Sequence, residues 1–129
     1  MATVYRYEDL LVWQESRSLS TTIYKKFLNN RDYDFKSQIQ RAAVSIMNNI
    51  AEGFDRNKID ETNKSFIYFL DIAYGSCGEV NSMTYLAEDL LYLTSDEALD
   101  LRKTCYSLSS KLYAFIQTLK NNPKPLSPK

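Results

Sequence analysis

Apolar side chains recur every three or four residues through most of this chain, which is the spacing typical of helices. The longest such stretch is residues 60–93, which contains no proline and would form a helix of about 50 Å. At about 100° per residue, its apolar side chains cover most of the circumference. A helix that is apolar nearly all round lies at the centre of a protein. We therefore expect residues 60–93 to form a buried central helix.

Three further patterns predict shorter helices. Residues 8–28 carry two neighbouring apolar stripes, and residues 35–55 carry one stripe with Asp34 as the expected N-cap. Asp60 is the expected cap of the central helix, while Thr94 and Glu97 have the spacing of a capping box. The last helix runs to about residue 121, and its apolar positions alternate in spacing between four and three, as in a bundle seam. Those positions are Leu101, Cys105, Leu108, Leu112, Phe115 and Leu119.

Short connections between four helices require that successive helices alternate in direction. The predicted fold is therefore all-α, an antiparallel up-down-up-down four-helix bundle that forms one domain over residues 1–121. Residues 122–129 contain all three prolines of the chain and are expected to be a flexible tail.

The composition restricts the chemistry. The 129 residues include no histidine, which excludes Ser-His-Asp and Cys-His catalysis and histidine-ligated zinc. Cys77 and Cys105 lie at apolar positions, so we expect buried free thiols in a reducing cytoplasm, and no cofactor. No segment has the length and apolarity of a membrane span. The formal net charge is zero, with 16 basic and 16 acidic residues, which weakens the case for a dedicated nucleic-acid binder.

A polar stripe lies beside the apolar stripe of residues 35–55. Its members are spaced by four, four, three and four residues and so share one helix face: Arg41, Ser45, Asn49, Glu52 and Arg56. Glu79 of the central helix could reach the same face. We predict a polar network that fixes a helix or subunit contact. A solvated charged face is the alternative, and acid–base or metal chemistry by Glu52 and Glu79 is the least favoured reading because no histidine is available.

Small residues interrupt the central helix. Gly75 and Gly78 each cost about 1 kcal/mol relative to alanine in mid-helix, so their small size should serve a close contact. We predict close helix packing at Gly53, Gly75, Ser76 and Gly78, with a ligand notch as the alternative. Gly53 could also serve as a helix C-cap.

The apolar surface exceeds what one small core requires, which predicts a homo-oligomer. The expected interface residues are Leu10, Trp13, Tyr24, Leu28, Ile67, Tyr74, Tyr85 and Tyr92. The bundle also places a set of basic residues at one end: Arg6, Arg56, Lys58, Lys64, Lys120 and Lys124. Repeated around a ring, this end could bind the phosphates of RNA or DNA. Ordinary surface charge is the alternative.

Three segments carry a family resemblance. They are Arg41-Ala-Ala-Val-Ser-Ile-Met-Asn-Asn-Ile-Ala-Glu-Gly-Phe-Asp-Arg56, Phe69-Leu-Asp-Ile-Ala-Tyr-Gly-Ser-Cys-Gly-Glu79 and Tyr7-Glu-Asp-Leu-Leu-Val-Trp13. Together they resemble the bacterial 23S ribosomal RNA intervening-sequence proteins, whose members are often labelled as ribosomal proteins. That family is also similar to the accessory variability determinant proteins of diversity-generating retroelements, which form five-fold barrels and bind nucleic acid and a reverse transcriptase.

The resemblance implies a bacterial four-helix bundle that forms a homopentamer and has no enzymatic activity. We therefore predict a non-enzymatic assembly or adaptor module in the cytoplasm. Its expected partners are further copies of itself, RNA or DNA, or a nucleic-acid-processing protein. Direct binding of RNA or DNA through the basic end is the alternative function.

Overall fold

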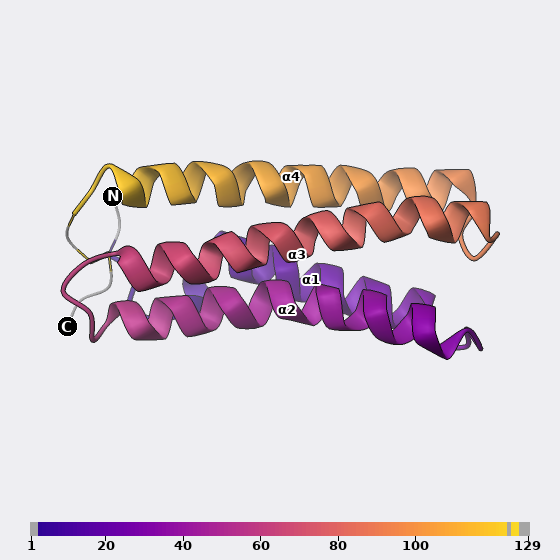
Figure 1. Cartoon of the computed structure of the whole chain (residues 1–129), viewed down its shortest axis with the longest axis horizontal. Coiled ribbons are helices and arrows are strands. Elements are labelled where there is room, and N and C mark those ends of the chain that lie inside the picture. The colour runs from indigo at the N-terminus through magenta and orange to yellow at the C-terminus, as the bar shows by residue number, and fades with distance from the viewer. Residues whose placement is uncertain (1–2, 124, 127–129) are drawn as a thin grey trace.

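The computed structural model describes residues 3–123, 125 and 126, and within that part of the chain the regular structure is helical (Figure 1). A 3-10 turn, η1 (Tyr7–Asp9), precedes four helices: α1 (Leu11–Lys26), α2 (Tyr33–Asn57), α3 (Lys64–Asp89) and α4 (Ser95–Lys120). Successive helices run in opposite directions, and both chain ends lie at the left of the view. The all-α, up-down-up-down bundle predicted from the sequence is confirmed.

One apolar stripe from each helix builds the core. Ile23, Ile46, Leu70 and Leu108 represent the four helices, and each side chain is completely buried. The predicted core stripe of α2 is buried throughout: Phe35, Ile39, Ala42, Ile46, Ile50 and Gly53. Because each helix turns the rest of its circumference outward, the bundle leaves broad helix faces available for other contacts.

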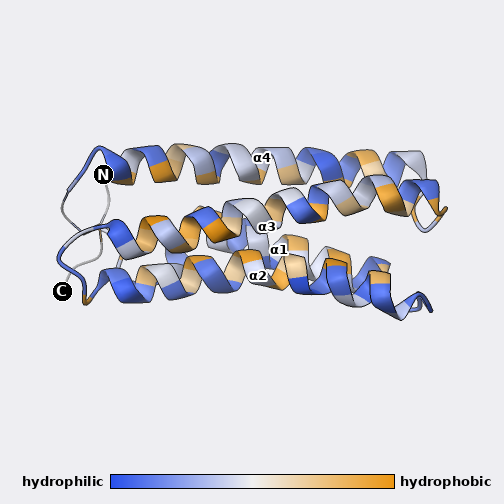
Figure 2. Cartoon of the chain, in the orientation of Figure 1, coloured by the Kyte–Doolittle hydropathy of each residue, from blue (hydrophilic) through white to orange (hydrophobic). Residues whose placement is uncertain are grey.

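The helix α3 is less buried than its composition suggested. Phe66, Leu70 and Val80 are completely buried, but the opposite face exposes Tyr68 by 62% and Leu86 by 46%. A single four-helix bundle covers only one side of each helix. The prediction that this helix is buried nearly all round is therefore wrong for one copy of the chain. Figure 2 shows the hydrophobic segments that recur along α3.

At two of the helices, the N-cap is a different residue from the one predicted. Asp32, not Asp34, caps α2, because its Oδ1 accepts the Phe35 N–H at 3.2 Å and its Oδ2 accepts the Tyr92 hydroxyl at 2.7 Å. Helix α3 begins at Lys64, with Asn63 rather than Asp60 at the N-cap position. The capping box of Thr94 and Glu97 is present as predicted.

Two other expectations differ from the structure. Ile116 takes the buried seam position predicted for Phe115. Phe115 is half-buried and meets the Phe66 ring edge-on, with 5.3 Å between the ring centres. In the predicted tail, the Leu126 N–H donates to Asn63 Oδ1 at 3.0 Å, and the Leu126 side chain packs on the core. Residues 122–126 thus include docked positions, while 124 and 127–129 lie outside the described residues.

Candidate functional site

The polar stripe of α2 is connected over only part of its length. Ser45 Oγ shares a hydrogen bond with Ser76 Oγ of α3 at 2.8 Å. Asn49 donates from Nδ2 to the backbone oxygen of Ser45 at 2.7 Å and to its hydroxyl at 3.0 Å. These three half-buried or buried groups join α2 to α3, so this portion of the predicted network does fix a helix contact.

The charged members of the stripe stay near solvent. Glu52 and Arg56 form an i,i+4 ion pair at 3.2 Å, with half-exposed side chains. Arg41 and Glu79 line one hollow of about 320 Å³ beside Ser45 and Ser76, and no ion pair joins them among the described residues. The predicted connection of Arg41, Asn49, Glu52 and Glu79 is therefore wrong within one chain, because Glu52 turns outward to Arg56.

The glycines divide into two groups. At Gly53, an added Cβ would lie 2.8 Å from Cβ of Phe69 and 2.9 Å from Cδ1 of Phe66, so the absence of a side chain allows α2 to approach α3. At Gly75 and Gly78, an added Cβ would have no atom within 4 Å beyond the helix itself. The prediction of close helix packing at these two glycines is wrong within the chain, because both face outward.

The outward face of α3 carries small residues flanked by large exposed side chains. Gly75, Gly78 and Ser82 form its middle line, since they are three or four residues apart. Large exposed side chains flank that line: Tyr68, Ile72 and Leu86 on one side, and Tyr74 and Tyr85 on the other. We call these eight residues the α3 outer face. It presents aromatic and aliphatic side chains beside a line of small residues, and the exposed Asp71 and Glu79 lie among them.

The predicted interface residues are divided between the core and the surface. Those exposed by 42–63% are Tyr24, Leu28, Tyr74 and Tyr85. Leu10 is buried, and Trp13, Ile67 and Tyr92 pack against the core. The Trp13 ring lies 5.2 Å from that of Tyr7, and the Arg17 guanidinium lies 5.8 Å from its centre. The packed residues complete the bundle of a single chain.

The predicted basic residues that the structure describes do lie at one end of the bundle, but most of them already have carboxylate partners. Arg6 lies within 4.0 Å of Glu8 and Asp9, Arg56 pairs with Glu52, and Lys58 lies 3.8 Å from Asp55. Two further members line one hollow of about 300 Å³ at the first turn of α3, namely Lys64 and Lys120. Lys124 lies outside the described residues. The structure thus leaves Lys64 and Lys120 as the cations of this end with no ion pair among residues 3–123, 125 and 126.

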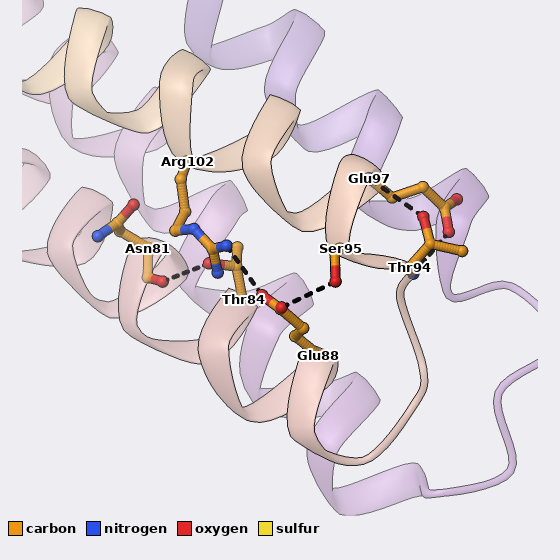
Figure 3. Close-up of polar contacts among 7 residues, drawn as sticks. All are labelled: Asn81, Thr84, Glu88, Thr94, Ser95, Glu97 and Arg102. Carbon is orange, nitrogen blue, oxygen red and sulfur yellow. Dashed lines mark hydrogen bonds and ion pairs between the residues drawn. The ribbon is translucent and has the colours of Figure 1, made fainter.

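The opposite end carries a cluster of polar contacts around Glu88 (Figure 3). Glu88 accepts from Arg102 Nη2 at 2.8 Å and from the Ser95 hydroxyl at 3.1 Å, and these bonds lower the pKa of Glu88. Arg102 also covers the Tyr85 ring at 4.1 Å, while its buried Nη1 has no hydrogen-bond partner among the described residues. One turn earlier, Thr84 donates to the backbone oxygen of Asn81 at 2.6 Å.

The capping box adjoins this cluster. The Thr94 backbone N–H, then Lys26, lower the pKa of Glu97 to about 2. Beside these paired carboxylates, Asp89, Asp96 and Asp100 have no ion pair within the described part of the chain. The α3–α4 connection also exposes Leu90 by 45% and Leu91 by 88%, and Leu99 near the start of α4 is 46% exposed; we call these three residues the leucine tip.

A buried asparagine pair, absent from the sequence predictions, joins the other end. Asn57 Nδ2 donates to Asn63 Oδ1 at 2.8 Å, and Asn63 Nδ2 donates to the Asn122 backbone oxygen at 2.7 Å. Asn57 is completely buried and Asn63 is 2% exposed. In the sequence, these two polar residues lie between predicted helices and look like part of an ordinary loop. Only the tertiary contacts reveal the bonded group of Asn57, Asn63 and the Asn122 backbone, which we call the asparagine clasp.

Metal ligation, free thiols and membrane-spanning length can be checked directly in the described residues. Within residues 3–123, 125 and 126, no group of three or more Cys, Asp or Glu residues is arranged to hold a metal ion. Cys77 and Cys105 are buried free thiols, and the contact between them, followed by burial, raises the pKa of Cys105. Among the described helices, none combines the length and apolarity that a membrane crossing requires.

Comparisons with known proteins find a matching family model and a similar solved structure. Residues 8–114 match a family model described as 23S rRNA-intervening sequence protein. A similar crystal structure comes from Bacteroides thetaiotaomicron VPI-5482 and is described as a protein with unknown function from the S23 ribosomal protein family. The match has a TM-score of 0.73 and 22% sequence identity, and covers 83% of this chain and 99% of that one. No curated protein matches the chain. Neither description names a catalytic activity.

Proposed function

This chain belongs to the 23S rRNA-intervening sequence protein family, and on that premise we propose that it is a non-enzymatic, homo-oligomeric assembly module that acts as an adaptor in the cytoplasm. The proposal is carried by the two outward glycines of α3. Each costs about 1 kcal/mol of helix stability relative to alanine, yet no contact within the chain uses the space it leaves.

A second copy would use that space. Backbones approach closely where side chains are small, and the flanking tyrosine, isoleucine and leucine side chains of the α3 outer face supply apolar contact area. Exposed tyrosine, isoleucine and leucine side chains that gather on one helix face are typical of a surface that contacts another molecule. In a ring, this face meets a different face of the next copy. Our candidate for that second face is the side of α1 that carries the exposed Tyr24. Five copies is the number implied by the resemblance to the retroelement accessory proteins.

Gly78→Leu tests the assembly directly. The variant chain should fold, because an added Cβ meets no atom within 4 Å, but leucine would prevent the close approach of a second copy. Sedimentation of the wild-type protein should give about five times the 15.0 kDa mass of the chain, and the variant should sediment as a smaller species.

Ala114→Leu is the matched control, because it adds the same side chain to an exposed position of α4 and should leave the assembly intact. A wild-type protein that remains monomeric at micromolar concentration refutes the proposal. Unchanged sedimentation of Gly78→Leu would refute the α3 outer face as the interface.

Direct binding of RNA or DNA is the second candidate. The observation in its favour is the pair Lys64 and Lys120, which line one hollow at the basic end. Filter binding to structured RNA across a salt series separates the candidates, because phosphate contacts weaken steeply as salt rises. Negligible binding at low salt would exclude this candidate, and loss of binding in Lys64→Gln with normal sedimentation would support it.

A further inference from the structure

The end of α3 contains a leucine in a backbone conformation that favours glycine. Leu91 has a φ of 61°, and it is the one residue with a positive φ outside glycine among the described residues. The Leu91 N–H donates to the Glu88 oxygen at 3.1 Å and the Tyr92 N–H donates to the Ala87 oxygen at 2.8 Å. This is the Schellman pattern, in which glycine normally occupies the position of Leu91. Leucine is therefore a locally unfavourable choice here.

The Leu91 side chain contributes little to the packing of the fold. It is 88% exposed and is accompanied by Leu90 and Leu99 in the leucine tip. Figure 2 shows the α3–α4 connection as a hydrophobic segment at the end of the bundle far from both chain termini. A strained, exposed, apolar residue in the connection at one end of the bundle indicates a surface that contacts another molecule.

The charged residues beside the leucine tip limit the kind of molecule that could bind there. Residues 86–103 contain five carboxylates, of which Glu88 and Glu97 are satisfied by Arg102 and Lys26. The other three are exposed: Asp89, Asp96 and Asp100. Lys103 is the remaining cation of this segment, whereas Lys25, Arg31 and Lys36 belong to the neighbouring α1–α2 side. The α3–α4 side of this end therefore offers leucine side chains with a surplus of negative charge.

A second copy of the chain fits this surface poorly. A symmetric contact between two leucine tips would bring the same exposed carboxylates together, which costs free energy. A head-to-tail contact would set the tip against the basic end, where Arg6, Arg56 and Lys58 already have carboxylate partners and Lys64 and Lys120 have none among the described residues. Such a contact also propagates into an open stack rather than a closed assembly.

We infer that the leucine tip is a docking site for a basic amphipathic helix of another protein. Leucine side chains at i, i+3 or i+4, and i+7 of that helix pack on Leu90 and Leu91, and its lysine or arginine residues face Asp89, Asp96 and Asp100. This inference rests on the adaptor part of the proposed function and assigns it a surface and a partner chemistry.

A synthetic peptide tests the inference. The probe is an 18-residue, dye-labelled helix with a leucine stripe and lysine at the other positions, and the control peptide has glutamate in place of lysine. Fluorescence anisotropy should show binding of the lysine peptide, weaker binding as salt rises, and no binding of the glutamate peptide. Leu91→Gly should weaken the lysine peptide about tenfold, because one leucine contact is lost.

Two control measurements distinguish binding at the leucine tip from nonspecific binding of the peptide. Leu91→Gly should melt at or above the wild-type temperature, because glycine relieves the positive φ. Ile59→Ser removes an exposed apolar side chain at the opposite end and should leave peptide affinity unchanged. Equal binding of the two peptides, unchanged affinity in Leu91→Gly, or an equal loss in Ile59→Ser would overturn the inference.

Sedimentation of the same samples distinguishes the two proposals. If Leu91→Gly alters the oligomeric mass without peptide, the leucine tip belongs to the contact between copies, and the docking inference is wrong. If the wild-type chain is monomeric but binds the lysine peptide through Leu91, the assembly proposal fails and the docking site stands.

Discussion

At the scale of single residues, Glu97 links a helix cap to an ion pair. Its folded-state pKa is about 2, below the ordinary value of 4.5, because the Thr94 backbone and Lys26 favour the charged form. A lowered pKa contributes stability that is present above pH 4.5 and is lost as pH falls towards 2. We predict a carboxyl NMR titration with a midpoint near 2 for Glu97. Thr94→Ala should move that midpoint upward; an unchanged midpoint would contradict the role of the cap.

Glu52 gives a second prediction at this scale. Its side chain is half-exposed, and its ion pair with Arg56 lies at the surface, so Glu52→Ala should change the free energy of unfolding by only about 0–1 kcal/mol. Urea unfolding would measure the change, with Glu52→Gln as the control for charge alone. A loss of about 3–5 kcal/mol would instead indicate that assembly buries this carboxylate against a cationic partner.

At the scale of the elements, the asparagine clasp holds the α2–α3 connection against the segment after α4. Asn63→Ala removes the acceptor of Asn57 and Leu126 and should destabilise the fold by about 1–3 kcal/mol. Exposed Asn48 of α2 is the control, since its replacement by alanine should stay within about 0.5 kcal/mol. Equal melting temperatures for the two variants would show that the clasp contributes nothing.

The element scale also shows what sequence reasoning could reach. Periodicity and the capping box specify the four helices and their order, because both signals are local. The choice of Asp32 over Asp34 depends on the Tyr92 hydroxyl, which is distant in sequence. The same is true of the clasp. Conversely, Gly53 and Gly75 look alike in the sequence, and only the position of α2 against α3 reveals that one is enclosed and the other open.

At the scale of the whole molecule, the two ends of the bundle differ in kind. One end holds the termini, the asparagine clasp and cations that mostly have carboxylate partners, whereas the other end holds the leucine tip and exposed carboxylates. If copies assemble side by side around a ring, with the α3 outer face of each copy against a different face of the next, all of them point in the same direction. The proposed assembly would then present several leucine tips on one rim, which favours partners with more than one basic helix.

The position of Trp13 has a consequence for spectroscopy. This is the single tryptophan of the chain, and it lies near the start of α1 beside Tyr7 and Arg17. The length of α1 separates it from the leucine tip by about 20 Å. Intrinsic tryptophan emission should therefore respond to unfolding at the end that holds the termini, yet stay constant when a ligand occupies the opposite end. An emission shift on addition of a tip ligand would report a change transmitted along the bundle.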